Sequence, residues 1–298
     1  MTPVSVLCPV DFSDASGAAL TYAAALADHF QARLTVMTVD DPILESAAIT
    51  AHLVPSMATE TDRELHRFVE AQLPPTFDRA RIDVRRAVGS PAPEIIKAAA
   101  ELHADLMVMS SHGRSGLSKR FFGSTTERVL RTTSVPVLIT PGERPAGQTL
   151  TAMAQGLGLI LAPVDLTAAS AHQVSVAAGL SRSLALPLLL GHVLEPVFAP
   201  PSAAHVIPGL EAERMASAQD RLKRVAAAAG DAGGLVETIV VSGDPSGEIA
   251  SLAQARGARL IVMGLHSTGL LGPRMGSVTY RVLCQVNALV LALPPAAV

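Results

Sequence analysis

The sequence is poor in the residues that mark disulfide-rich, zinc-binding and nucleic-acid-binding proteins. It has no tryptophan and two cysteines among 298 residues, and charged residues make up 16% of the chain. Cys8 and Cys284 lie far apart and neither belongs to a CxxC pair, so we expect two buried free thiols in a reducing compartment. The formal net charge of −3 provides no basic excess, which argues against nucleic acid as a partner.

Long apolar runs and targeting signals are missing as well. No apolar stretch reaches the roughly 18 residues that a membrane-spanning helix needs. The N-terminal residues Met1–Ser5 lack the basic region of a signal peptide. We therefore expect a soluble, cytoplasmic protein with no membrane partner.

The chain is instead rich in apolar residues and contains an internal repeat. Apolar residues make up 49% of it, and its length predicts two domains of about 150 residues each. The segment Cys8–Ser13 (CPVDFS) returns as Ala162–Thr167 (APVDLT), an offset of 162 − 8 = 154 positions. Near the end of each copy Gly123 matches Gly276, an offset of 153, so the second copy has lost one residue after His266.

Each half alternates short β-branched runs with longer helical patterns, which is typical of βαβ units around a parallel sheet. A helix is expected to begin after the N-cap Ser13, and another to begin at Pro91. Residues 41–76 and 195–230 are expected to form long connections that contain a helix. The predicted strands are 4–10, 33–39, 81–88, 105–110 and 135–140 in the first half and 158–164, 187–194, 235–241, 259–264 and 288–293 in the second.

These elements predict the α/β fold class, with two tandem doubly wound, five-stranded parallel-sheet domains of Rossmann-like type. The expected boundaries are 1–142 for the first domain, 143–156 for a linker rich in Gly, Pro and Thr, and 157–298 for the second domain. Ligands of such sheets bind at the carboxyl ends of the strands, where the winding direction switches. Residues that follow the first and fourth strands are therefore the candidates for a site.

Those positions carry groups suited to a nucleotide. Asp11 ends the first strand and is an acceptor for an adenine amine or a ribose hydroxyl. After the fourth strand, Ser110 and Gly113 are followed by nine residues and then by Gly123-Ser124, which open a helix. Glycines and a helix N-terminus expose N–H groups that favour phosphate, so the sequence predicts an anion cradle.

At this point the sequence resembles the universal stress protein family over nearly all of both halves. The ATP-binding members of this family carry Gly, two residues, Gly, nine residues and then Gly-Ser or Gly-Thr. In the first half Ser110 stands at the first glycine, and the rest of the motif matches. In the second half Gly264 matches, but Ser267 replaces the second glycine and only eight residues precede Gly276, so this phosphate loop is degenerate.

The resemblance implies an adenine nucleotide α-hydrolase-like fold and a site for ATP, or for AMP or ADP, with or without bound Mg²⁺. It implies that Asp11 faces the adenine, that Val39 bonds the base through its backbone, and that Met109 lies near the nucleoside. The residues implied at the ribose and phosphates are Ser110, His112, Gly113, Gly123, Ser124, Thr125 and Thr126. Their second-half counterparts are Asp165, Val193, Met263, Gly264, His266, Ser267, Gly276, Ser277, Val278 and Thr279.

Each residue also has a simpler interpretation. Asp11 is equally suited to cap the first turn of its helix, and Met109 to be an ordinary core residue at a strand end. His112 on its own is typical of a solvent-facing loop. The basic residues of the loop, which are either phosphate ligands or merely solvated, are Arg114, Lys119 and Arg120.

No Walker A sequence, nucleophile elbow or HExxH motif occurs, so no catalytic residue is assigned and at most a weak ATPase is expected. The leading hypothesis is a stress-response protein that binds ATP or a related adenine nucleotide and acts as a nucleotide-dependent regulatory module, as a homodimer or with a regulatory protein partner. The alternatives are a weak ATP hydrolase and a structural or ligand-carrying protein that has lost nucleotide binding.

Overall fold

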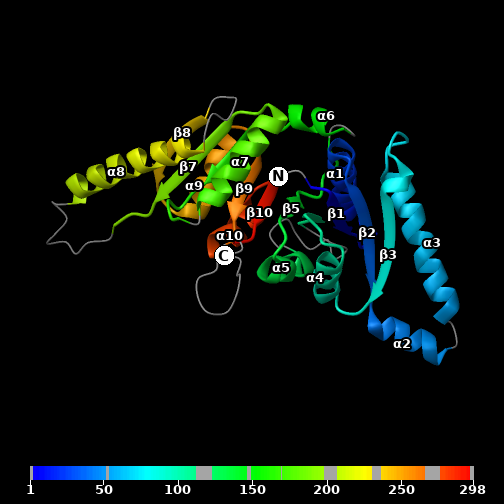
Figure 1. Cartoon of the computed structure of the whole chain (residues 1–298). Helices are drawn as coiled ribbons and strands as arrows, with labels where there is room; N and C mark the ends of the chain where they lie inside the picture. Colours follow the sequence, from blue (N-terminus) through cyan, green and yellow to red (C-terminus); the bar gives the residue numbers. More distant parts are fainter. Residues whose placement is uncertain are drawn as a thin grey trace. The chain divides into compact units, whose positions relative to one another are not determined.

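A computed structural model describes residues 3–51, 54–111, 123–145, 149–168, 170–197, 207–229, 236–265 and 276–295. The chain divides into two compact units, of which one runs to Met153 and the other begins at Ala154. No helix in the described ranges is long and apolar enough to cross a bilayer. Each unit is an α/β domain, and Figure 1 shows both in colours that follow the sequence.

The first unit is built on a parallel sheet of strand order β3-β2-β1-β4-β5. Its strands are β1 (Ser5–Pro9), β2 (Arg33–Asp40), β3 (Ile82–Val88), β4 (Leu106–Ser110) and β5 (Val137–Thr140). The chain first winds outward from β1 to β3 and then returns to β4 on the other side of β1. The winding direction therefore switches between β1 and β4, which is where a doubly wound sheet places its ligand.

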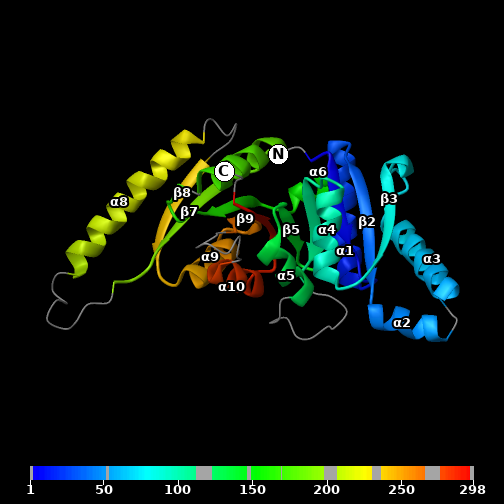
Figure 2. The same ribbon diagram turned by 60° about the horizontal axis from the view of Figure 1, so that its bottom comes forward.

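Helices cover both faces of this sheet, as Figure 2 shows in a second view. Right-handed crossovers place α1 and α3, which contact each other, on one face, and α4 and α5, which also contact each other, on the opposite face. The helices are α1 (Asp14–Phe30), α2 (Pro42–Thr50), α3 (Val54–Gln72), α4 (Pro91–Glu101) and α5 (Ser124–Thr132), with a short 3₁₀ helix η1 (Arg79–Arg81) before β3.

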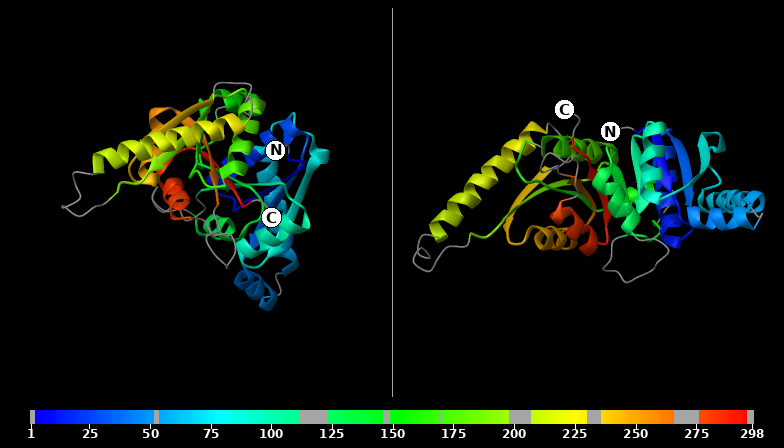
Figure 3. Two further views of the ribbon diagram at one scale, coloured as in Figure 1. Left: turned by 60° about the vertical axis from the view of Figure 1, so that its left-hand side comes forward. Right: turned by 90° about the horizontal axis from the view of Figure 1, so that it is seen from below.

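The second unit repeats this topology with strand order β8-β7-β6-β9-β10, all of its strand pairs parallel. Its strands are β6 (Leu159–Pro163), β7 (Leu188–Leu194), β8 (Val236–Ser242), β9 (Ala258–Gly264) and β10 (Leu289–Leu293). Its helices are α7 (Ser170–Leu184), α8 (Ile207–Ala228), α9 (Pro245–Ala255) and α10 (Ser277–Gln285). Figure 3 shows α8, coloured yellow, beside β7 and β8, with which it is in contact.

The predicted fold class is confirmed. Each end of every predicted strand lies within two residues of the corresponding end of an observed strand. The first long connection holds two helices, α2 and α3, where one was expected. Residues 143–156, expected as the linker, include the helix α6 (Leu150–Gln155), in which Leu150 and Met153 are buried. The sequence did not predict the bounds of α2, α3 and α6, because polar and small residues in these segments weaken the periodic spacing of apolar residues that marks a helix.

Alanine explains how α1 approaches the sheet so closely. Ala18, Ala19, Ala23 and Ala24 are fully buried on this helix, and their small side chains let the backbone lie near β1 and β4. The expected cap is present, because the Ser13 hydroxyl accepts a hydrogen bond from Ser16 N at 3.2 Å. This cap fixes the first turn of α1 a few residues after the carboxyl end of β1.

Cys8 lies within β1 and is fully buried, and this burial raises the pKa of its thiol. Because the thiolate is the reactive form, we expect native protein to resist alkylation at Cys8 while Cys284, half-buried on α10, reacts with iodoacetamide. Mass spectrometry of peptides labelled before and after unfolding tests this. Labelling of Cys8 at the rate of Cys284 in native protein would contradict it.

Candidate functional site

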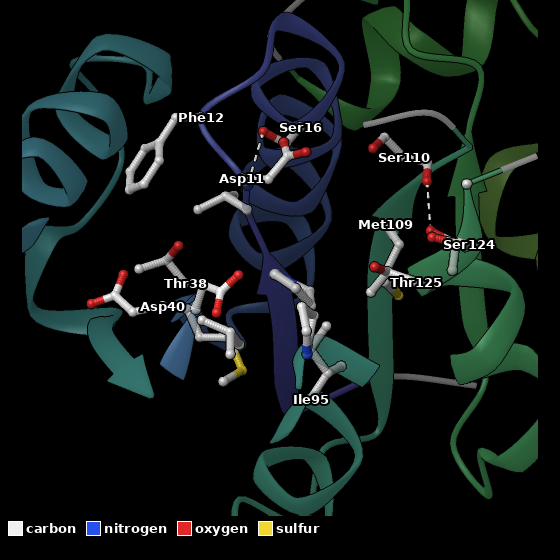
Figure 4. A pocket seen from close by; sticks show the side chains of 18 residues that line it. Asp11, Phe12, Ser16, Thr38, Asp40, Ile95, Met109, Ser110, Ser124 and Thr125 are labelled. Atoms are coloured by element: carbon white, nitrogen blue, oxygen red, sulfur yellow. Dashed lines mark hydrogen bonds between the residues drawn. The ribbon is translucent and has the colours of Figure 1, made fainter. Parts of the chain in front are cut away.

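The first unit has a cleft of about 460 Å³ at the carboxyl ends of its strands. This volume lies within the roughly 300–1,000 Å³ typical of small-molecule sites. The cleft lies over the switch between β1 and β4, and Figure 4 shows its side chains. Its lining residues are Pro9, Val10, Asp11, Phe12, Ser16, Met37, Thr38, Val39, Asp40, Asp41, Pro91, Ile95, Met109, Ser110, Gly123, Ser124, Thr125 and Thr126.

Eight of the ten residues expected in the first half line this single cleft. They come from four elements that lie far apart in the sequence, and the topology brings them to one edge of the sheet. The other two, His112 and Gly113, lie outside the described residues, as do the basic positions Arg114, Lys119 and Arg120.

Asp11 lines the cleft, and the helix cap that its simpler interpretation expected is instead provided by Ser13. One carboxylate oxygen of Asp11 accepts hydrogen bonds from Ser13 N at 3.1 Å and from the Ser13 hydroxyl at 2.5 Å. The same Ser13 hydroxyl caps α1, and Ser16 Oγ accepts from Asp11 N at 3.3 Å. This chain of bonds orients the Asp11 carboxylate rigidly at the mouth of β1.

The opposite end of the cleft is the N-terminus of α5. Gly123 occupies the N-cap and has no side chain with which to cap the first turn. Its backbone N–H donates to Ser111 O at 2.8 Å, and the buried Thr126 hydroxyl donates to Ser110 O at 2.9 Å. These bonds fasten the start of α5 to the end of β4, so its first-turn N–H groups and its dipole favour an anion in the cleft.

Sequence reasoning missed the residues that build the side of the cleft nearest β2. Phe12 packs edge-to-face on Phe68 of α3, with ring centroids 5.6 Å apart. Asp40 accepts from Arg86 of β3 at 2.9 Å, and this ion pair is largely buried. Their place in the sequence could have identified three of them, because Thr38, Asp40 and Asp41 are neighbours of Val39 at the carboxyl end of a predicted strand. The lining residues that sequence reasoning did not assign to the site are Pro9, Val10, Phe12, Ser16, Met37, Thr38, Asp40, Asp41, Pro91 and Ile95.

The second unit has a cleft of the same volume, about 460 Å³, at the equivalent edge. Its lining residues are Pro163, Val164, Asp165, Gln173, Gly191, His192, Val193, Leu194, Glu195, Arg214, Pro245, Ile249, Met263, Gly264, Val278 and Thr279. Of the expected residues, Gly276 and Ser277 do not line this cleft, and His266 and Ser267 lie outside the described residues. Sequence reasoning did not single out Gln173, His192, Glu195 or Arg214.

Within the described ranges, no group of three or more His, Cys, Asp or Glu side chains is arranged to hold a metal ion. Asp165 repeats the role of Asp11, because one of its oxygens accepts from Thr167 N, from the Thr167 hydroxyl and from Ser170 Oγ, the last at 2.5 Å. The turn that follows the first strand is therefore held in the same way in both units.

The doubly wound sheets and the clefts over their switch points define the class of doubly wound α/β domains, in which ligands bind at this edge of the sheet. The model of the universal stress protein family matches residues 5–141 and again residues 158–294. The chain therefore belongs to the universal stress protein family, and it carries two copies of the family's domain.

Individual members resemble one half of the chain or all of it. Universal stress protein YxiE of Bacillus subtilis (strain 168) is 29% identical over 142 residues, which cover 45% of this chain and 96% of that protein. A universal stress protein from Archaeoglobus fulgidus DSM 4304 shares the fold over 99% of both chains, with a TM-score of 0.67 and 20% identity. A universal stress protein in complex with cAMP covers 48% of this chain and 100% of its own, with 25% identity and a TM-score of 0.35.

Proposed function

We propose that this stress protein binds ATP or a related adenine nucleotide in the cleft of its first unit and acts as a nucleotide-dependent regulatory module. The observation that carries the proposal is that the oriented Asp11 carboxylate and the N-terminus of α5 lie at opposite ends of one cleft. An adenine nucleotide has this polarity, with donor groups on the base and negative charge on the phosphates.

The residues between these ends suit the nucleoside. Asp11 accepts from the exocyclic amine, while the apolar side chains of Val39, Ile95 and Met109 contact the faces of the base. Ser124 and Thr125 present hydroxyl groups beside the first turn of α5, where the phosphates would lie. No lysine or arginine lines the described part of this cleft, so the described residues offer the phosphates only N–H groups, hydroxyls and the helix dipole.

Isothermal titration calorimetry with ATP, ADP and AMP tests this proposal on the full-length chain. We expect one ATP to bind per chain, because the second cleft lacks part of the phosphate end. Binding of none of the three nucleotides would overturn the proposal, and two equal ATP sites would overturn the expected asymmetry. Incubation with ATP and Mg²⁺ is expected to leave the nucleotide intact, and turnover would instead favour the weak hydrolase.

A further inference from the structure

The second cleft keeps the base end of the first cleft. Asp165, Val193, Ile249 and Met263 occupy the positions of Asp11, Val39, Ile95 and Met109 and come from the same elements of the repeat. The equal volumes of the two clefts show that neither has been filled by larger side chains. A planar base with a polar edge therefore has equivalent walls in the second unit.

The opposite end of the second cleft differs. In the first cleft, the entire start of α5, Gly123–Thr126, lines the cavity, whereas α10 contributes only Val278 and Thr279. Val278 replaces the hydroxyl of Thr125 by an apolar side chain, and Thr279 is buried with its hydroxyl 3.4 Å from Gly264 O. This end of the described cleft thus presents less polar surface to a phosphate.

The floor of the second cleft also carries a buried amide that the first cleft lacks. Gln173 of α7 replaces Ala19 of α1 and is 3% exposed. Its Nε2 donates to Pro163 O at 2.6 Å and to Val262 O at 2.8 Å, so it ties the ends of β6 and β9 at the switch point. Both bonds use Nε2, and no donor in the described part of the chain reaches Oε1, which leaves an acceptor at the cleft.

A second acceptor comes from His192, which replaces Thr38. Its Nδ1 lies 2.7 Å from Val164 O, and a carbonyl can only accept, so Nδ1 carries the proton. In the neutral ring Nε2 is then an acceptor, and no described residue donates to it. Together with the Asp165 carboxylate, these atoms give the floor a set of acceptors, which favours a ligand with N–H and O–H groups. Arg214 of α8 also lines this cleft, and its guanidinium donates to Glu195 O at 3.1 Å.

We propose that the second cleft binds an uncharged nucleoside, its base between Val193, Ile249 and Met263 and its donor groups on Gln173 Oε1 and His192 Nε2. This inference extends the proposed function from one nucleotide site to two sites with different ligands. A single chain would then respond to a nucleotide through one unit and to a dephosphorylated nucleoside through the other.

The experiment uses full-length protein in which Asp11→Ala and Gly123→Val together disable the first cleft. Calorimetry with adenosine is expected to show one site per chain, and ATP is expected to bind there no more tightly than adenosine. Gln173→Ala and His192→Thr restore the first-cleft residues, and each is expected to weaken adenosine binding about two- to tenfold, the effect of one lost neutral hydrogen bond. Thermal melting shows whether each variant is folded.

Several results would overturn this inference. They are an absence of adenosine binding, ATP binding at least tenfold tighter than adenosine, or adenosine binding that neither substitution changes. Should Gln173→Ala unfold the second unit, His192→Thr decides, because a threonine occupies that position in β2 of the first unit. Failure of the wild-type chain to bind ATP would count against the proposed function only, since this test is made with the first cleft disabled.

Discussion

Replacement of Gly123 by valine is expected to remove ATP binding and leave the fold intact. Gly123 has φ −60° and ψ 128°, a conformation that a β-branched residue adopts readily, so the backbone itself does not require glycine there. The added side chain would instead lie at the N-cap, where phosphate must approach the N–H groups of α5. Loss of two charge-assisted hydrogen bonds at roughly 1.5–3 kcal/mol each weakens binding by about a hundredfold or more.

Gly276 provides the matched control for this experiment. It is the N-cap of α10, with φ −64° and ψ 155°, but it does not line the second cleft. Gly276→Val is therefore expected to leave ATP affinity unchanged, with both variants melting like the wild type. Calorimetry and thermal unfolding on the two proteins measure this, and equal loss of ATP binding in both would refute the asymmetry between the units.

The asymmetry also has a source in the sequence that lies outside the described residues. One residue is missing between Gly264 and Gly276, Ser267 adds a Cβ where the motif has glycine, and Pro273 lacks a backbone N–H. In the described residues, the corresponding difference is that Gly276 and Ser277 do not reach the cleft. Both differences support the proposed weaker binding of phosphate in the second unit.

The fold was predictable because its strands are parallel and because the inner strands are buried on both faces, whereas the edge strands β3 and β8 are half-exposed. Runs such as 159–163 (LILAP) and 289–293 (LVLAL) are almost wholly apolar, and the repeat supplied each strand twice. The helix α2 was not predictable by the same means, since its isoleucines Ile43 and Ile49 are exposed and so do not follow the burial pattern on which the prediction relied. Its start depends on a local signal, the N-cap Asp41 followed by Pro42.

Only those residues of the candidate site that belong to a local sequence motif could be predicted. The switch-point rule and the glycine spacing identify Asp11 and Gly123 without a structure. The contacts of Phe12 with Phe68 and of Asp40 with Arg86 join residues 56 and 46 positions apart, since 68 − 12 = 56 and 86 − 40 = 46. No local pattern encodes such pairs, and Gln173 was hidden for the same reason, because its partners Pro163 and Val262 come from different strands.

The two units differ in the long-range contacts that connect each cleft to the neighbouring helix, α3 in the first unit and α8 in the second. In the first unit, side chains of the cleft reach α3, through Phe12 to Phe68 and through Asp40 and Arg86 to Asp62, the last with N···O of 3.6 Å. In the second unit leucine replaces both Phe12 and Asp40. There, arginines of α8 instead donate to backbone oxygens, Arg221 to Leu166 O at 2.8 Å and Arg214 to Glu195 O at 3.1 Å.

Asp11→Ala is expected to weaken ATP binding by tenfold or more and to lower the free energy of unfolding by about 1 kcal/mol. The binding loss follows from removal of the carboxylate that accepts from the base. The stability loss follows because Ser13, which caps α1, would lose the acceptor of both its N–H and its hydroxyl. Calorimetry and urea unfolding measure the two effects separately.

Asp11→Asn separates these two roles of the residue. The amide oxygen of asparagine can still accept from Ser13, so stability is expected to stay within about 0.5 kcal/mol of the wild type. ATP affinity is still expected to fall, because asparagine lacks the negative charge that strengthens a hydrogen bond from the base amine. Asp165→Ala serves as the control in the second unit, where the same turn is disturbed without effect on the ATP site. Wild-type ATP affinity in Asp11→Asn and Asp11→Ala alike would leave Asp11 a residue that orients the capping Ser13 and would remove it from the nucleotide site.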